Sequence, residues 1–272
     1  MRQFSISPFE MGHSCWRNRH LLRTLIQRDV VGRYRGSLMG ILWSFFHPLL
    51  MLAIYTLVFS VVFKARWGSG NESRSEFALI LFAGLLVFNL FAECVVRAPG
   101  LILSNANYVK KVIFPLEILP LVALGSAFFH MLIGIFVWLT FYVAFVGIPP
   151  KTLWLLPLVV IPPLLLTIGV SWLLASLGVY LRDVTHVAGV ATTAMMFLCP
   201  IFYPTSSLPP EYQILLNLNP LTPAINHFRQ ILVWGLVPDL PGFGLYMLVS
   251  VIVAWLGFAW FQATRKGFAD VV

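Results

Sequence analysis

Long apolar runs alternate with short polar segments along the chain, and five of these runs can cross a bilayer as helices. A helix needs about 20 apolar residues to span the hydrocarbon core. The runs that meet this length are 39–63, 77–96, 116–146, 152–181 and 243–261. A sixth run, 185–203, is slightly short but contains no Asp, Glu, Lys or Arg. The pattern predicts an all-α integral membrane protein with six transmembrane helices.

The segment 204–242, between the fifth and sixth predicted spans, is apolar but is broken by seven prolines. No piece of it is long enough to span. Pro209 and Pro210 open one short helix, and Thr222 with Pro223 supplies the cap and first residue of a second. Because two short apolar helices cannot cross, we expect a re-entrant hairpin on the outer side, packed against protein or a water-filled cavity.

Residues 16–30 have the spacing of an amphipathic helix. One face holds Trp16, Leu21, Leu22, Leu25, Ile26 and Val30, and the other holds Arg17, Arg19, Arg23, Gln27 and Arg28. A basic amphipathic helix lies in the plane of the membrane interface with its apolar side down. The alternative is a helix packed on the cytoplasmic face of the protein itself. We therefore divide the chain into a cytoplasmic segment, 1–38, with an interfacial helix, and a six-helix transmembrane domain, 39–272.

Composition agrees with a membrane protein. Of the 272 residues, 59% are hydrophobic and only 10% are charged, against roughly 25% charged in soluble domains. The continuous runs exclude a β-barrel, whose segments alternate over about 10 residues. The net charge of +8 does not indicate nucleic acid, because the basic residues gather beside the apolar runs. Cys15, Cys94 and Cys199 are too scattered for a disulfide framework or a zinc site, so we expect no metal.

The basic residues also predict orientation. Lys and Arg near the ends of spans are held on the cytoplasmic side. Six spans with a cytoplasmic N-terminus place 13 of the 18 Lys and Arg residues inside and 5 outside. We therefore expect both termini in the cytoplasm.

Motifs for covalent chemistry or nucleotide binding are missing. The sequence has no HExxH, GxSxG, DxD or GxxxxGK[ST] pattern. Glu93 and Arg97 have the spacing of an ion pair on one helix, which we interpret as structural. His130, alone in the third span, is interpreted as a hydrogen-bonded packing residue rather than a proton relay.

Two further segments suggest function. The loop NANYVKKVIFPLEILP, 105–120, predicts a short basic helix on the cytoplasmic side, suited to docking a soluble partner, although orientation alone accounts for its lysines. The fifth span carries a stripe of small, polar and polarizable residues: Thr185, Gly189, Thr192, Met196, Cys199 and Tyr203. This stripe faces either a close helix contact or a conduit, to which Trp43, His47 and Tyr55 of the first span would add aromatic and polar groups.

Three segments resemble one known family. RDVVGRYRGSLMGILWSFFHPLL is similar to the first-span entry of type-2 ABC exporter permeases. LRDVTHVAGVATTAMMFLCPIFYPTSSLP resembles their fifth-span region, and NLNPLTPAINHFRQIL resembles the stretch that follows it. The likeness covers nearly the whole chain in order. Among members, it is strongest to the membrane subunits that export O-antigen, capsule or teichoic acid polysaccharides.

This resemblance implies a homodimer that works with two copies of a separate ATPase subunit, which would bind ATP and Mg, so that this chain carries no cofactor and is no enzyme. It implies roles for four groups of residues. ATPase coupling falls to Asn105, Tyr108, Lys110, Lys111, Arg182 and Asp183; the conduit to Trp43, His47, Tyr55, Thr192, Met196, Cys199 and Tyr203; the phosphates of a lipid carrier to Arg28, Arg33 and Arg35; and the outer gate to Pro209, Asn219, Pro220, Phe228 and Arg229.

The function expected from the resemblance is ATP-driven export of a lipid-linked polysaccharide, most specifically O-antigen, across the bacterial cytoplasmic (inner) membrane. Its partners would be a second copy, the ATPase, the glycan and membrane lipids, and not nucleic acid. Two rivals stay open: a type-2 exporter of a small or lipidic cargo, which would lack a wide conduit, and an intramembrane transferase. The transferase would be active without any ATPase, and the missing acidic motifs oppose it.

Overall fold

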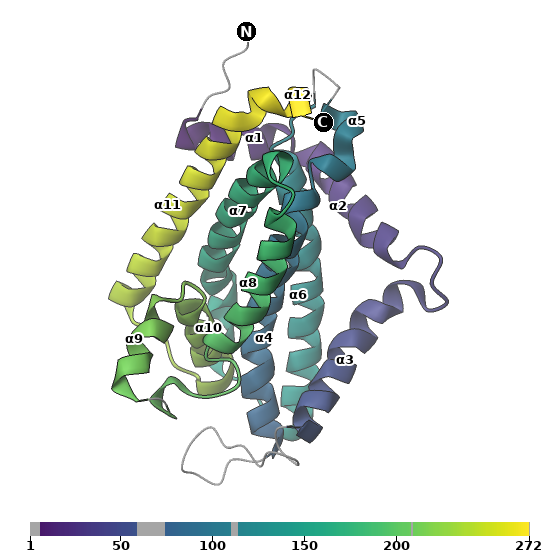
Figure 1. Ribbon diagram of the computed structural model, residues 1–272. Helices are drawn as coiled ribbons and strands as arrows, with labels where there is room; N and C mark the ends of the chain where they lie inside the picture. The colour runs from purple at the N-terminus through teal and green to yellow at the C-terminus, as the bar shows by residue number, and fades with distance from the viewer. Residues whose placement is uncertain (1–5, 59–73, 110–113, 208, 272) are drawn as a thin grey trace.

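The computed structural model describes residues 6–58, 74–109, 114–207 and 209–271, and these residues form helices and no strand (Figure 1). The α-helices are α1 Pro8–Arg17, α2 Arg19–Tyr34, α3 Trp43–Tyr55, α4 Arg74–Arg97, α5 Ala106–Val109, α6 Ile118–Phe145, α7 Leu156–Tyr180, α8 Val184–Leu198, α9 Pro210–Leu218, α10 Thr222–Arg229, α11 Leu240–Thr264 and α12 Phe268–Val271. The prediction of an all-α fold is confirmed for these residues.

Five stretches are long and apolar enough to cross a membrane: Gly40–Val58, Ser75–Gly100, Ile118–Phe145, Lys151–Tyr180 and Leu240–Val271. They correspond to five of the predicted spans. The sixth candidate, α8, has only 15 residues, about 22 Å of helix against a core of about 30 Å. It ends early because Cys199 precedes Pro200 and is extended, with φ −92° and ψ 148°. A count of six spans therefore stays a prediction.

Helix α4 is the centre of the bundle. It packs against α6, α7, α8 and α10, and 78% of its most apolar window is buried. Trp138 of α6 is fully buried and donates a hydrogen bond to the carbonyl of Leu79 at 3.0 Å. Because indole N–H groups need a partner when buried, this bond fixes the register of α6 on α4.

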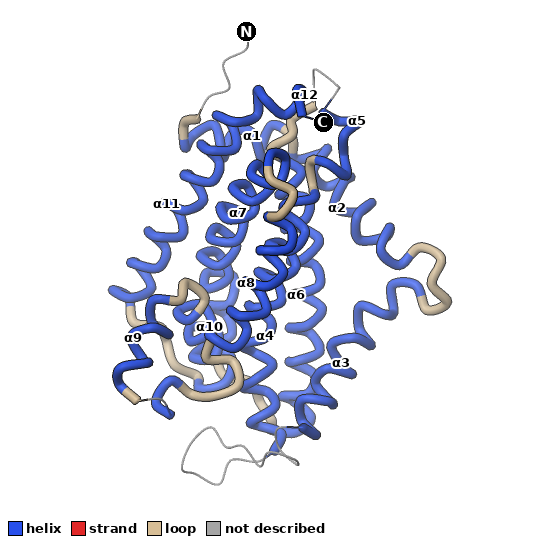
Figure 2. Tube along the Cα trace, in the orientation of Figure 1, coloured by secondary structure: helices blue, strands red, loops and turns tan. Residues whose placement is uncertain are grey.

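Successive long helices run in alternating directions, so that α1, α5 and α12 share one end of the bundle and α9 and α10 lie towards the other (Figures 1 and 2). We call these the termini end and the hairpin end. This arrangement agrees with both termini lying on one side of a membrane.

The N-terminal segment differs from the prediction of one helix over residues 16–30. It forms two helices, α1 and α2, with a break at Asn18. Leu25 and Val30 of α2 are buried, and Leu25 packs with Ile118 and Val122 at the start of α6. The apolar face of α2 thus contacts the protein itself, as the alternative interpretation expected, and its position in a membrane interface stays a prediction.

Helices α2 and α3 form a V whose tip points away from the bundle (Figure 1). Gly36 and Gly40 bracket the turn with φ of 85° and 53°, values that residues with a Cβ rarely adopt. Leu38 at the tip is fully exposed. A cavity lies between the arms of the V and the faces of α4 and α6.

Candidate functional site

An ionic cluster joins the end of α2 to the middle of the bundle. Its members are Asp29, Arg33 and Tyr34 of α2, Glu93 and Arg97 of α4, and His130 of α6. The exposed fractions of the Asp29, Arg33, Glu93, Arg97 and His130 side chains are 21–30%. Partial burial strengthens the attraction between charges and makes an unpaired charge costly.

A two-pronged hydrogen bond in the cluster joins Arg97 to Asp29. Arg97 donates from Nη2 to Oδ1 at 2.8 Å and from Nη1 to Oδ2 at 3.1 Å, which is the two-pronged geometry that carboxylates favour. The predicted pair between Arg97 and Glu93 is also present, at 3.6 Å on the same helix. Arg97 therefore ties α2 to α4.

Glu93 also contacts several members of the cluster. It pairs with Arg33 of α2, and its other oxygen lies 3.2 Å from Nδ1 of His130. Tyr34 closes the group with its hydroxyl 3.0 Å from Nε2 of His130. His130 is thus hydrogen-bonded, as predicted, but it belongs to a network that connects three helices.

Asp29 shows how the network overcomes the cost of burial. Burial would raise the pKa of the Asp29 carboxyl, but the hydrogen bonds and charge of Arg97, with the charge of Arg33, hold that pKa below its ordinary value. The ionised form of Asp29 is therefore the one that the folded protein stabilises.

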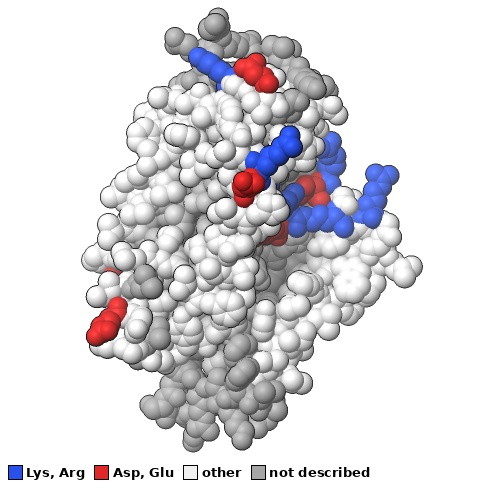
Figure 3. All heavy atoms as spheres, in the orientation of Figure 1, with Lys and Arg blue, Asp and Glu red and all other residues white. Residues whose placement is uncertain are grey.

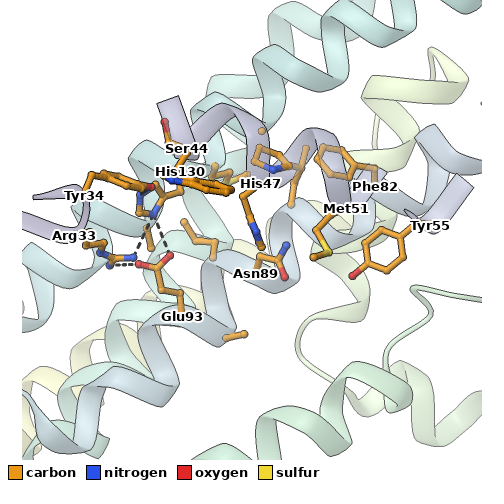
Figure 4. Close-up of a pocket in the computed structure, with 18 residues that line it drawn as sticks. Arg33, Tyr34, Ser44, His47, Met51, Tyr55, Phe82, Asn89, Glu93 and His130 are labelled. Carbon is orange, nitrogen blue, oxygen red and sulfur yellow. Dashed lines mark hydrogen bonds and ion pairs between the residues drawn. The ribbon is translucent and has the colours of Figure 1, made fainter. Parts of the chain in front are cut away.

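The space beneath the V is a cavity of about 590 Å³, which we call the α3 cavity. Its polar lining comes from Arg33, His47, Tyr55, Asn89, Glu93 and His130, and its apolar lining includes Trp43, Met51 and Phe82 (Figure 4). The charged side chains lie at one end of the cavity, His47 and Asn89 in the middle, and Tyr55 and Phe82 at the other (Figure 4). Four predicted site residues, Arg33, Trp43, His47 and Tyr55, therefore line one space.

A second cavity of about 400 Å³, the α2 cavity, lies between α2, the end of α4 and the start of α6. Arg28 and Asn105 line it, with Ser104 and the Asp29–Arg97 pair. Arg28 and Arg35 are exposed, and neither has an ion-pair partner among the described residues. Of the three arginines predicted to meet phosphate, Arg33 alone is paired with carboxylates.

The predicted coupling residues that the structure describes lie at the termini end. Tyr108 of α5 stacks on Phe114 with ring centres 4.2 Å apart and 6° between the planes. Arg182 and Asp183 are exposed in the turn between α7 and α8, which lies at the same end (Figure 2). Lys110 and Lys111 lie outside the described residues. The two predicted docking segments thus share one end of the bundle.

A buried ion pair bonds to Phe114, the residue that stacks on Tyr108 of α5. Arg265, after α11, pairs with Glu117 at 2.5 Å and donates to the carbonyl of Phe114 at 2.8 Å. Ser14 of α1 donates to the other oxygen of Glu117 at 2.9 Å, and Trp172 of α7 donates to its backbone carbonyl at 2.9 Å. Four separate segments meet at Glu117, which sequence reasoning missed because no local pattern links them.

The residues of the predicted stripe, on α8 and just after it, differ in how deeply they are buried. Cys199 is fully buried and Thr192 nearly so, and the Thr192 hydroxyl bonds back to the carbonyl of Ala188 at 2.6 Å. Met196 and Tyr203 are half-buried, and Tyr203 donates to the carbonyl of Phe197 at 2.6 Å. Burial favours close packing over an open conduit at Thr192 and Cys199, and the conduit role of the stripe stays a prediction.

The two predicted short helices are present as α9 and α10, and their inner residues bond to α4 and to the end of α8. Their re-entry into a membrane stays a prediction. Arg229 is 1% exposed and donates to the carbonyls of Ile80 at 3.0 Å and Ile201 at 2.8 Å. Asn219 donates to the carbonyl of Leu198 at 3.3 Å. Phe228 is fully buried, while Pro209 and Pro220 are exposed. Sequence reasoning treated Arg229 as an outer basic residue, but its guanidinium lies inside the fold.

Charged side chains are unevenly distributed over the surface seen in Figure 3. Basic side chains gather on the side where α2 lies, with acidic side chains among them, and most of the remaining described surface in this view is uncharged (Figure 3). Among the described residues, no group of three or more His, Cys, Asp or Glu side chains is placed to hold a metal ion.

Taken together, the long apolar helices of the described residues define a multi-pass membrane protein, with a charge cluster beside the first span and two short helices before the last. Residues 20–233 match the family described as "ABC-2 type transporter", and the chain belongs to that family. The matched region includes the ionic cluster, the α3 cavity and the hairpin.

The chain matches relatives of nearly equal length that are named for O-antigen export or for polysialic acid transport. The chain is 28% identical over 256 residues to the O-antigen export system permease protein RfbA of Myxococcus xanthus, covering 93% of this chain and 96% of the relative. It is 26% identical to a protein of the same name from Klebsiella pneumoniae, covering 93% and 95%. It is 20% identical to the polysialic acid transport protein KpsM of Escherichia coli, covering 90% and 93%.

Proposed function

We propose that this chain is the membrane-spanning subunit of an ATP-driven exporter that moves a lipid-linked polysaccharide, most specifically O-antigen, out of the bacterial cytoplasm. The observation that carries the proposal is the end-to-end likeness to permeases named for O-antigen export, which covers 93% of this chain. A further relative named for transport of polysialic acid supports glycan as the class of cargo.

A separate ATPase subunit would supply the energy. This part of the proposal is supported by the lack of a phosphate-binding loop in the sequence and by membership of an ABC-type transporter family. The α5 segment and the exposed turn at Arg182 and Asp183 lie at one end of the bundle, which suits contact with a soluble partner. Movement of the α5 segment would reach α1, α7 and α11 through the Glu117–Arg265 pair. Hydrogen bonds and the ion pair at these two residues connect the three helices to the start of α6.

The chain would act as a homodimer in the cytoplasmic membrane with both termini inside. The basic residues support this orientation, since 13 of 18 fall on the side of the termini when six spans are counted. Only 11% of the most apolar window of the first span is buried. An apolar helix covered so little by its own chain suits contact with lipid and a second copy.

The lipid carrier would approach beside α2. Arg28 and Arg35 are exposed and have no carboxylate partner among the described residues, so their guanidinium groups are available to phosphate oxygens. Arg33 is a poorer candidate because Asp29 and Glu93 already hold it. The α9–α10 hairpin would form the outer gate.

Deletion of the chain followed by fractionation tests the proposal. We expect lipid-linked polysaccharide to build up on the cytoplasmic face of the membrane and surface glycan to fall, with both restored by a plasmid copy. If surface glycan is unchanged and no lipid-linked glycan accumulates, the chain does not export polysaccharide. Build-up of a small or lipidic compound instead would support the rival cargo.

A further inference from the structure

The α3 cavity has a polar wall whose formal charges balance. Its lining contains one guanidinium, Arg33, and one carboxylate, Glu93, and the two form an ion pair. A phosphate entering this cavity would meet the Glu93 carboxylate beside the Arg33 guanidinium. Because carboxylates repel phosphate and already occupy the arginine donors, the cavity is suited to an uncharged ligand rather than an anion.

Asn89 and His47 offer hydrogen-bonding groups that the chain itself leaves unused. Within the described residues, neither side chain has a hydrogen-bond partner, and both are exposed. Figure 4 shows them next to each other in the middle of the cavity, one from α4 and one from α3. Between them, an amide and an imidazole can both donate to and accept from the same hydroxyl-bearing ligand.

The position of Asn89 inside an apolar span supports a ligand-binding role for its amide. It lies in the most buried of the five apolar spans, where its neighbours Phe88 and Leu90 are 4% and 2% exposed. Polar side chains inside apolar spans are costly, and those that persist tend to face a cavity and mark a substrate path. Asn89 faces the cavity and serves no described contact within the fold.

The remaining wall fits a sugar ring. Trp43 and Tyr55 add aromatic faces, which pack against the apolar C–H faces of a ring. Pro48, inside α3, cannot donate to the carbonyl of Ser44, so a backbone acceptor on the cavity wall lacks its helical hydrogen bond. The volume of about 590 Å³ lies within the range of small-molecule sites.

We propose that the α3 cavity of each protomer binds one uncharged sugar unit of the glycan, with Asn89 and His47 bonding its hydroxyls and Trp43 packing on its ring. This inference rests on the proposed export of a polysaccharide, and it separates two tasks along the chain. The cavity holds sugar, and Arg28 of α2 and Arg35 just after α2 meet the phosphates of the carrier.

Cysteine protection tests occupancy of the cavity. Met51→Cys places a thiol on the cavity wall in a Cys15→Ser chain, since Cys94 and Cys199 are buried. The probe is a phosphate-free oligosaccharide released from the surface glycan of the same cells, added to the assembled transporter in nanodiscs. We expect it to slow labelling of Met51→Cys by a small methanethiosulfonate, and not labelling of Thr140→Cys, an exposed position on α6 away from the cavity.

Two results would overturn the proposal. Slowing by inorganic diphosphate but not by the oligosaccharide would assign the cavity to the carrier. A thiol at position 51 that resists labelling without any added sugar would mean that a second copy or lipid fills the cavity.

Affinity gives the second test. Loss of one or two neutral hydrogen bonds weakens binding by about tenfold, so Asn89→Ala with His47→Ala should raise the oligosaccharide concentration needed for half protection by about that factor. Thr140→Ala should leave it unchanged. Unaltered protection in the double variant would refute the assignment of Asn89 and His47. Failure of these variants is distinct from failure of the export function, because the deletion phenotype reports on export alone.

Discussion

The Glu117–Arg265 pair gives the sharpest prediction about stability. The two side chains are 6% and 11% exposed and lie 2.5 Å apart. Removing one member of such a pair leaves a buried charge without its partner, which costs about 3–5 kcal/mol. We expect Glu117→Gln and Arg265→Gln each to lower the free energy of unfolding by about that amount.

The double variant should lose less than the sum of the two single losses. Once either charge is removed, the other no longer contributes a paired interaction, so neutralising it as well relieves an unpaired charge. Ser14→Ala should cost less, about 1.5–3 kcal/mol, because it removes one hydrogen bond to a charged group. Glu211→Gln, at an exposed carboxylate on α9, is the matched control and should stay within about 0.5 kcal/mol of the parent chain.

The assay is reversible unfolding of the purified chain in mixed micelles, followed by tryptophan fluorescence. Trp172 donates to the carbonyl of Glu117 at 2.9 Å, so its emission reports on this region. Single variants that unfold at the midpoint of the parent chain would refute the reasoning. A double variant that loses the full sum would show that the two charges act independently.

Three further predictions concern packing, buried donors and pH. Gly257→Leu should destabilise by at least about 1–3 kcal/mol in the same assay, because a Cβ at Gly257 would collide with the backbone of Gly169 on α7, whereas Gly244→Ala, with open space around it, should be nearly neutral. Arg229→Met should cost at least about 3 kcal/mol by removing the hydrogen bonds that its guanidinium donates to buried carbonyls on α4 and after α8, and Arg229→Lys should recover part of that loss. Asp29 has a folded pKa below its ordinary 3.8, so its contribution is complete above that pH and is lost as pH falls through the folded pKa. Asp29→Asn should flatten that part of the stability profile, and an unchanged acid slope would contradict the role of the Asp29–Arg97 bond.

Much of the fold follows from the hydropathy pattern because lipid leaves the backbone few alternatives to a helix. The five longest apolar runs all became helices of spanning length. The shortness of α8 is a local effect of Pro200, which forces Cys199 out of the helical conformation. The break at Asn18 lies in a segment where no apolar run was long enough to impose one continuous helix.

The site was only partly predictable, because many of its contacting residues are far apart along the chain. Trp43, His47 and Tyr55 were found together because they share one short helix. Asn89 was missed because a single amide inside an apolar run carries no pattern of its own. The bonds from Arg97 to Asp29 and from Arg265 to Glu117 span 68 and 148 residues. Only folding brings such partners together, and charge spacing along one helix reveals only the nearer pairs, such as Glu93 with Arg97.

The most direct test of the account is transport by the reconstituted complex. The chain and its cognate ATPase subunit are placed in liposomes with radiolabelled lipid-linked glycan, and the labelled glycan that crosses the bilayer is measured with and without ATP. We predict movement that requires ATP and both subunits, and that stops when the ATPase subunit is omitted. Movement by this chain alone at an equal rate, or no movement of glycan by the complete complex, would contradict the central claim.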